Sequence, residues 1–174
     1  RRVNDNMPGY AAERVEGLLG TLADKRVLIM GLTFRPDVAV TPHTNAVDLL
    51  REFSIPVYGT PLTLAFVADR LKERGLLERA DLRPLRPRGR VELGSFTVEA
   101  IRVTHSIVDG IGLAIETPVG ALVHTGDFKL DSSPIDGEHP DYQRFAELGE
   151  RGVLVLCSDS TNVGRPGHTR SESE

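Results

Sequence analysis

The chain has 174 residues, 40% of them hydrophobic, and a formal net charge of −4. These values are typical of one ordinary globular domain with a hydrophobic core, and the net acidity excludes bulk electrostatic attraction to nucleic acid. The single cysteine, Cys157, excludes an internal disulfide. No apolar stretch approaches the roughly 20 residues that span a bilayer, so no membrane partner is expected. No signal peptide is visible at Arg1, so we expect a cytoplasmic protein; a first residue other than methionine suggests a piece of a longer chain.

A helix, a buried strand and a second helix are predicted in the first third of the chain. Apolar residues recur at helical spacing over Ala11–Leu22. Lys25–Leu32 is a short apolar run with a glycine near its end, which is typical of a buried parallel strand. After a proline-containing loop, Thr44 or Asn45 can cap a second helix that extends to about Phe53.

From Ile55 onward most of the predicted elements are short strands. The first is Ile55–Gly59, and Thr60 and Pro61 then open a helix that extends to about Arg74. Further strands are separated by glycine-containing turns: Leu82–Leu85, Arg90–Leu93, Phe96–Val103, Gly112–Glu116 and Ala121–His124. Such a run predicts an antiparallel or mixed sheet.

The last predicted elements are a short helix and a buried strand. The helix spans Tyr142–Leu148, and the strand spans Gly152–Cys157, with Cys157 expected to be a buried small hydrophobe. The polar tail from Gly164 onward is expected to be mobile. Together the elements predict an α/β fold.

A short basic run lies within Asp81–Val91. It contains four arginines, at positions 83, 86, 88 and 90. A run of this length is more typical of a solvated turn than of a nucleic-acid-binding groove.

Two motifs place candidate metal ligands after predicted strands. Arg102–Asp109 contains His105, and Val123–Lys129 contains Asp127. Imidazole and carboxylate suit zinc or manganese, and two neighbouring strand ends could hold both side chains rigidly. A catalytic zinc ion, however, usually has about three protein ligands. The sequence contains no His-x-His-x-Asp-His cluster, so these residues form half of a metal site and no catalytic residue is assigned.

Other histidines and polar residues favour structural roles. His124 lies on an apolar strand and is expected to orient the loop that follows rather than to bind a metal. His139 and His168 lie in polar loops and should be solvated. Asp159 and Ser160 follow a strand and are expected to support their loop through hydrogen bonds.

The segments Arg2–Tyr10 and Lys25–Val38 resemble the nucleotide-sugar dehydrogenases of the UDP-glucose type. In that family the corresponding passage leads from a central helix into the nucleotide-binding C-terminal domain. The family's arginine ligand is missing near Pro42, and its catalytic cysteine and NAD-binding domain would lie upstream of Arg1. The resemblance implies a domain over residues 1–48 and, as an alternative function, a fragment that binds a UDP-sugar without dehydrogenase chemistry.

The rest of the chain resembles ribonuclease J, a bacterial and archaeal family of RNA-processing enzymes in the metallo-β-lactamase superfamily. The blocks that keep the family's order and spacing are Ile55–Leu64, Val91–Gly94, Ile101–Ile107, His124–Lys129 and Ser158–Asn162. The resemblance implies a partial αββα metallo-β-lactamase-like sandwich over residues 49–174, preceded by the short βα segment. It also implies RNA as partner and a centre of two Zn2+ or Mn2+ ions, in which His105 would ligate one ion and Asp127 would bridge both.

The resemblance also implies what these 174 residues lack. The family's histidine cluster lies just upstream of a segment matched by Leu49–Phe53, where the dehydrogenase-like stretch stands instead, and His43 does not align with the cluster. The β-CASP domain, which helps to clamp RNA, would lie beyond Glu174. We therefore expect a truncated 5′-exo/endoribonuclease-like hydrolase that is inactive alone, or an inactive chimeric remnant with a seam between about Val38 and Phe53. A half sandwich leaves an open edge, so self-association is also expected.

Overall fold

The computed structural model describes residues 13–14, 16–18, 20, 55–161 and 163–173. Residues 13–14 and 16–18 are helical, as predicted for Ala11–Leu22. The prediction that this helix reaches Leu22 is wrong, because Gly20 has left the helix with a φ of 86°. The strand and the second helix predicted between Lys25 and Phe53 lie outside the described residues. In the part of the chain that is described, no helix combines the length and apolarity needed to cross a bilayer.

The chain divides into two compact units, residues 1–57 with 67–81 and residues 58–66 with 82–174. A two-stranded sheet and two helical segments precede the main sheet: β1 (Pro56–Gly59), β2 (Asp81–Pro84), α4 (Pro61–Glu73) and the 3-10 helix η1 (Leu77–Arg79). Helix α4 begins as predicted, because the Thr60 carbonyl accepts the Leu64 N–H at 2.8 Å. Its buried residues, Leu64, Val67 and Leu71, recur at spacings of three and four, the pattern of an amphipathic helix.

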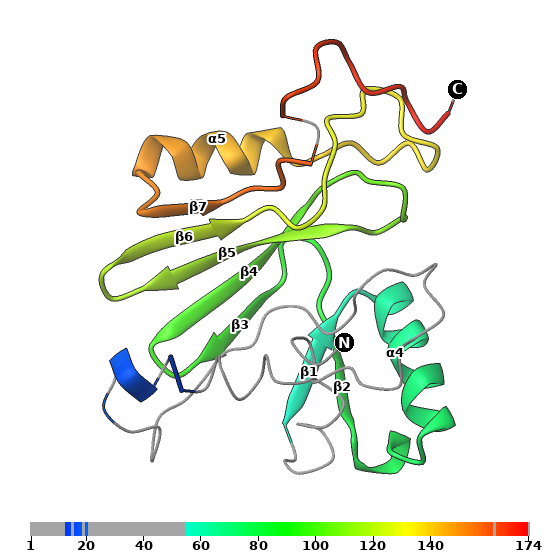
Figure 1. Cartoon of the computed structure of the whole chain (residues 1–174), viewed down its shortest axis with the longest axis vertical. Coiled ribbons are helices and arrows are strands. Elements are labelled where there is room, and N and C mark those ends of the chain that lie inside the picture. Colours follow the sequence, from blue (N-terminus) through cyan, green and yellow to red (C-terminus); the bar gives the residue numbers. More distant parts are fainter. Residues whose placement is uncertain (1–12, 15, 19, 21–54, 162, 174) are drawn as a thin grey trace. The chain divides into compact units, whose positions relative to one another are not determined.

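The larger unit contains a five-stranded sheet in the order β3-β4-β5-β6-β7 (Figure 1). Its strands are β3 (Arg90–Leu93), β4 (Phe96–Arg102), β5 (Ile111–Thr117), β6 (Gly120–His124) and β7 (Val155–Cys157). The pairs β3–β4, β4–β5 and β5–β6 are antiparallel, and β7 is parallel to β6. The sheet is therefore mixed, as predicted. The fold is α/β and is consistent with the expected partial sandwich.

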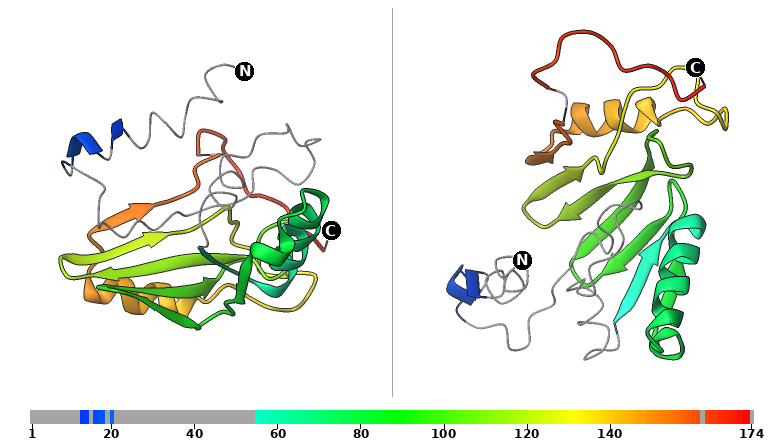
Figure 2. Two further views of the ribbon diagram at one scale, coloured as in Figure 1. Left: turned by 90° about the horizontal axis from the view of Figure 1, so that it is seen from below. Right: turned by 45° about the vertical axis from the view of Figure 1, so that its right-hand side comes forward.

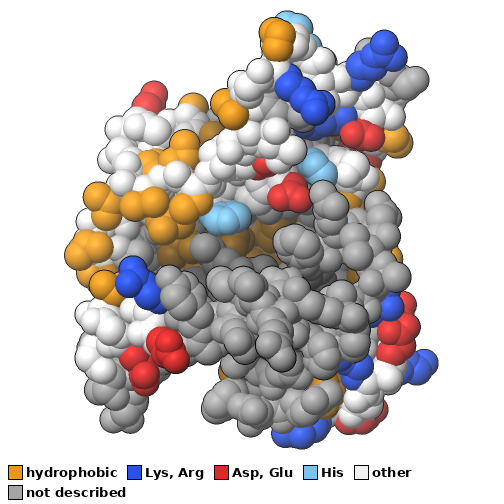
Figure 3. All heavy atoms as spheres, in the orientation of Figure 1, with side chains coloured by type: hydrophobic (Ala, Val, Ile, Leu, Met, Phe, Trp, Pro, Cys, Tyr) orange, Lys and Arg blue, Asp and Glu red, His pale blue; other side chains and the backbone are white. Residues whose placement is uncertain are grey.

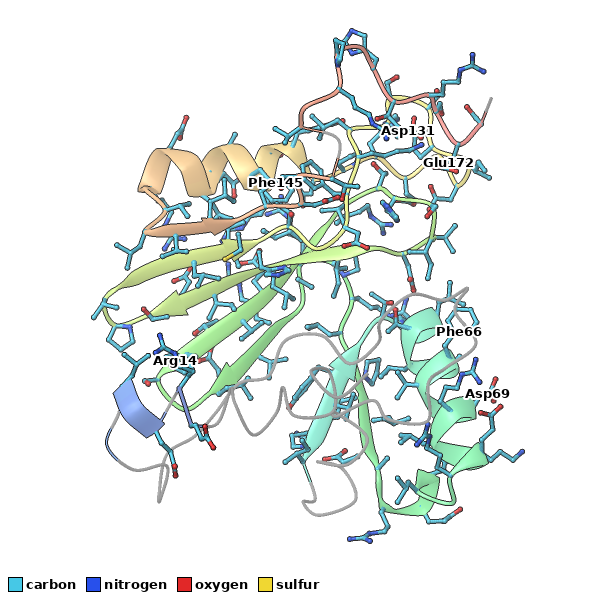
Figure 4. All side chains as sticks on the ribbon, viewed as in Figure 1. Arg14, Phe66, Asp69, Asp131, Phe145 and Glu172 are labelled. Atoms are coloured by element: carbon cyan, nitrogen blue, oxygen red, sulfur yellow. The ribbon has the colours of Figure 1, made fainter. Side chains whose placement is uncertain are left out.

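Helix α5 (Tyr142–Arg151) covers one face of this sheet (Figures 1 and 2). Its N-cap is Asp141, whose carboxylate accepts the Arg144 N–H at 3.0 Å. Leu148 is 1% exposed and packs with the residues that β4, β5 and β6 turn toward the helix: Ile101, Ala114 and Val123. Phe145 extends this contact from the first half of α5 (Figure 4). One hydrophobic core cluster of the larger unit therefore lies between α5 and the middle of the sheet.

A buried ion pair also joins α5 to the sheet. Glu99 of β4 is 3% exposed and accepts two hydrogen bonds from the Arg144 guanidinium, both at 2.8 Å. These hydrogen bonds raise the pKa of Arg144. Arg90 donates to the same carboxylate at 3.0 Å, and Arg88 binds Asp141 at 2.9 Å. At least two arginines of the basic run are therefore neutralised by carboxylates, which argues against a free cationic surface at this turn.

Strand β7 differs from its prediction as a buried strand over Gly152–Cys157. It begins only at Val155, and its residues are exposed, Leu156 to 64% and Val155 to 43%. The prediction that Cys157 is buried is also wrong, since this residue is exposed. The physical reason is that β7 is the last strand in the order, so within the described residues only one of its edges is paired. Hydrophobic side chains accordingly gather over β6 and β7 (Figure 3).

Candidate functional site

The candidate ligands lie in loops at one edge of the five-stranded sheet. Strands β4 and β6 both pair antiparallel with β5, and β7 is parallel to β6, so β4, β6 and β7 all end at the same edge. The loops that follow these strands carry His105, Asp127 and Asp159, respectively. The expectation of two neighbouring strands is thus corrected, because β5 lies between β4 and β6.

An isolated bridge ties the His105 loop to the Asp127 loop. Thr104 pairs with Lys129: the Lys129 N–H donates to the Thr104 carbonyl at 2.7 Å, and the Thr104 hydroxyl donates to the Lys129 carbonyl at 2.6 Å. The same hydroxyl accepts the Asp131 N–H at 3.4 Å. His105 directly follows one bridge residue and Asp127 precedes the other by two positions, so the structure brings the two loops together.

His105 and Asp127 supply suitable donor atoms but too few of them. His105 is half-buried, with its Nδ1 3.0 Å from the Ser106 hydroxyl, and Asp127 is exposed. Among the described residues no group of three or more His, Cys, Asp or Glu side chains could hold a metal ion. A catalytic zinc ion normally has three protein ligands. The donors of the described part therefore fit a zinc or manganese site in kind but do not complete one.

The third loop is held against the second by Thr125. This buried residue donates its N–H to the Cys157 carbonyl at 3.0 Å, and its hydroxyl accepts the Asp159 N–H at 3.1 Å. Asp159 in turn accepts the hydroxyl of Thr161 at 2.6 Å and the N–H of Thr161 at 3.0 Å. The expected loop-supporting role of Asp159 is therefore confirmed.

Groups from the other two loops also act on the carboxylate of Asp159. The hydroxyl and N–H of Thr161 contribute most to lowering the pKa of Asp159, and smaller contributions come from the Phe128 N–H and the charge of His105. These contributions come from both other loops. The three loops therefore form a continuous polar edge.

The other histidines in the described part of the chain match their predicted structural roles. Nδ1 of His124, which is half-buried, accepts the Gly126 N–H at 3.0 Å. This bond fixes the start of the Asp127 loop, where Gly126 adopts a φ of 64°. His139 and His168 are exposed, as expected.

A polar cluster that the sequence did not predict lies at the end of the Asp127 loop. Asp131 is 4% exposed and accepts N–H groups from Glu172 and Ser133, both at 3.0 Å (Figure 4). These two N–H groups, together with Ser171 and the charge of Lys129, lower the pKa of Asp131 to about 2. Lys129 also binds Glu172 at 2.6 Å. The tail expected to be mobile is thus hydrogen-bonded to this loop; its partners lie about 40 residues earlier in sequence, too far for local patterns to reveal.

A small pocket lies beside the His105 loop. It has a volume of about 60 Å3 and is lined by residues 102–109, 131, 134–136, 138 and 172. Sites for small organic ligands usually measure roughly 300–1,000 Å3. This pocket is therefore too small for a typical organic ligand. The candidate ligands lie instead in the exposed loops at the ends of β4, β6 and β7.

No family model matches the chain, but curated proteins with similar sequences are found. Ribonuclease J from Synechocystis is 55% identical over 126 residues, which are 71% of this chain and 20% of the relative. Ribonuclease J from Thermus thermophilus is 46% identical over 126 residues, covering 71% and 22%. Ribonuclease J from Helicobacter pylori strain 26695 is 42% identical over 137 residues, covering 78% and 19%. The chain thus spans about a fifth of the length of these relatives.

Among solved structures, a protein of unknown function from Enterococcus faecalis has a TM-score of 0.49 and 19% identity, covering 68% of this chain and 29% of its own. The sequence identities extend over most of the chain. Over 71–78% of its length, the chain is therefore homologous to ribonuclease J.

Proposed function

We propose that this chain carries part of the catalytic domain of a metal-dependent RNA hydrolase of the ribonuclease J type. The observation that carries the proposal is the shared sheet edge, where the loops of His105 and Asp127 are tied together by the Thr104–Lys129 bridge. A histidine and a carboxylate held on rigid neighbouring loops are the donors that a hydrolytic metal centre uses. The 55% identity to a ribonuclease J supports RNA as the substrate class.

In this proposal His105 would ligate a metal ion, zinc or manganese, and Asp127 would be the carboxylate shared by the metal centre. When bound, such ions supply an activated water and neutralise charge on a phosphodiester. The protein's own contribution is to hold the two donors: Thr104 fixes the start of one loop, and His124 fixes the start of the other through Gly126. Asp159 supports the third loop beside them.

The proposed metal site is incomplete within these 174 residues. The 174 residues contain no His-x-His-x-Asp-His cluster, and two protein ligands fall short of the usual three for one zinc ion. We therefore propose that this chain alone binds metal weakly and does not cleave RNA, and that further donors are needed for activity.

Calorimetric titration with Zn2+ and Mn2+ tests the ligand assignment. We expect less than one ion per chain in the wild type and no binding after His105→Ala or Asp127→Ala. The matched controls are His139→Ala and Asp69→Ala, which remove exposed side chains of the same types. Binding that survives both site substitutions, or that falls equally in the controls, would contradict the assignment.

RNA cleavage tests the incompleteness of the site. With labelled single-stranded RNA and added Mn2+, we expect the wild type to cleave no faster than the His105→Ala, Asp127→Ala double variant. Cleavage well above the double variant would mean that the chain completes a working site. That result would refute the incompleteness but would support the assignment of the two ligands.

We also propose a boundary near Leu49, with a nucleotide-sugar-dehydrogenase-like segment over residues 1–48 and the ribonuclease J-like part over residues 49–174. UDP-sugar binding by the first segment stays a prediction, because few of its residues are described. Calorimetry with a UDP-sugar tests it, and absence of binding would remove this alternative.

A further inference from the structure

The loop that joins β4 to β5 has an exposed tip and well-anchored ends. The Val103 N–H donates to the Gly110 carbonyl at 3.1 Å and closes the base of the loop. At the tip Ile107 is 37% exposed and Val108 is 51% exposed. Packing of the tip therefore cannot fix the conformation of the loop that contains His105.

Thr104 anchors the first end of this loop. Its side chain is 7% exposed, and its hydroxyl acts as both donor and acceptor: it donates to the Lys129 carbonyl at 2.6 Å and accepts the Asp131 N–H at 3.4 Å. No apolar side chain of the same shape could make either bond. The residue before His105 is thus tied directly to the loop of Asp127.

Asp109 anchors the other end. Its carboxylate accepts the hydroxyl of Thr60 at 2.9 Å and the N–H of Leu62 at 3.2 Å. Leu62 is the second residue of α4, so its N–H has no acceptor within the helix, and the helix dipole favours a negative charge there. Asp109 adopts a φ of 58°, a conformation that is uncommon outside glycine and that aspartate and asparagine tolerate better than most residues.

We propose that Thr104 and Asp109 are positioning residues that together hold His105 in place, Thr104 against the Asp127 loop and Asp109 against the start of α4. That His105 is a metal ligand rests on the proposed function. The two anchors, Thr104 and Asp109, are called the clamp below, and the clamp is a property of the folded chain without metal.

Hydrogen exchange of the full metal-free chain, followed by NMR, tests the clamp. Asp109→Asn keeps the size of the side chain and tolerates the same φ, but its amide nitrogen cannot accept a hydrogen bond. Because hydrogen bonds to charged groups are the stronger ones, we expect the Leu62 amide, which donates to Asp109, to exchange roughly tenfold faster. Thr104→Val removes only the hydroxyl and should accelerate the Asp131 amide, which donates to that hydroxyl, roughly two- to tenfold.

Rescue and control variants separate positioning from general destabilisation. Thr104→Ser keeps the hydroxyl and should retain the wild-type protection. Thr97→Val removes a hydroxyl that binds Glu92 on the sheet surface, and Asp136→Asn alters a carboxylate that accepts the Glu138 N–H. Neither control should change exchange of the Leu62 or Asp131 amide, and the amides of Ile101 and Ala114 in the sheet should stay protected in every variant.

Unchanged exchange of the Leu62 amide in Asp109→Asn and of the Asp131 amide in Thr104→Val would overturn the proposal. So would a loss of protection in Thr104→Ser as large as in Thr104→Val. If the variants do not fold, the wild type still decides, because the clamp predicts that the Leu62 and Lys129 amides exchange more slowly than those of Ser106 and Ile107. Since no metal is added, failure of the metal-binding proposal would leave these results unaffected.

Discussion

Similar apolar residues are buried in the middle of the five-stranded sheet and exposed at its β7 edge. Under α5, Ile101 and Val123 are at most 2% exposed and are sealed by Leu148 and the Glu99–Arg144 pair. At the β7 edge, Leu156 remains 64% exposed. The difference shows that the burial of a strand depends on what covers it and on its place in the strand order, not on its apolar composition alone.

Among the proposed substitutions, removal of Arg144 should lower the stability of the fold most, because Arg144 joins α5 to the sheet. Arg144→Ala would leave the Glu99 carboxylate, 3% exposed, without its principal partner. Breaking a buried pair in this way costs about 3–5 kcal/mol, so we expect a loss of this size in the free energy of unfolding, measured by urea denaturation.

Two further variants serve as controls for Arg144. Arg151→Ala, which breaks an exposed pair with Glu116, should leave the denaturation midpoint nearly unchanged. A Glu99→Leu, Arg144→Met double variant should recover much of the stability, because it removes both charges. An Arg144→Ala effect no larger than that of Arg151→Ala would mean that the pair does not hold α5 on the sheet.

Substitution on β7 should affect association rather than stability. Leu156→Lys places a charge on an exposed edge strand, which opposes strand pairing between molecules. We expect weaker concentration-dependent association in sedimentation velocity, with a change in the free energy of unfolding below about 0.5 kcal/mol. Ile135→Lys, at an exposed loop residue, is the control. A wild type that stays monomeric at its highest attainable concentration would contradict this prediction.

Acid should release the tail from the Asp127 loop, which is the smallest effect. The pKa of Asp131 is lowered from 3.8 to about 2, so its carboxylate stabilises tail docking fully above pH 3.8 and loses this effect as the pH falls through about 2. The amide resonance of Glu172 should therefore titrate near pH 2, and Asp131→Asn should abolish this titration, whereas Asp136→Asn should not. A Glu172 amide that titrates in the same way in Asp131→Asn as in the wild type would contradict the docking.

Much of the fold could be predicted because its signals are local. Glycines mark the turns between strands, and the Thr60–Pro61 pair marks the start of a helix. Strand β3 has the predicted bounds, and the bounds of β4 and β6 differ from the predicted ones by one residue. The exposure of Cys157 could not be predicted, since an apolar run such as Gly152–Cys157 does not specify its position in the sheet.

For the candidate site, the sequence could predict only the residues that lie within recognisable motifs. The motifs identify His105 and Asp127 as candidates and predict the loop-supporting roles of His124 and Asp159. They do not reveal the contacts that hold the loops, because Thr60 and Asp109 are 49 residues apart and Asp131 and Glu172 are 41 residues apart. Such pairs depend on tertiary structure, which single-sequence patterns do not encode.

Paramagnetic broadening by Mn2+ tests the central claim most directly, because it shows which amides lie near the bound ion. When Mn2+ is added to the 15N-labelled chain, we predict that the amides around His105 and Asp127 broaden first and together, and that His105→Ala abolishes the effect at both loops. Broadening that begins elsewhere, for example at His139 or Asp69, or that persists unchanged in His105→Ala, would contradict a shared metal site at this edge of the sheet.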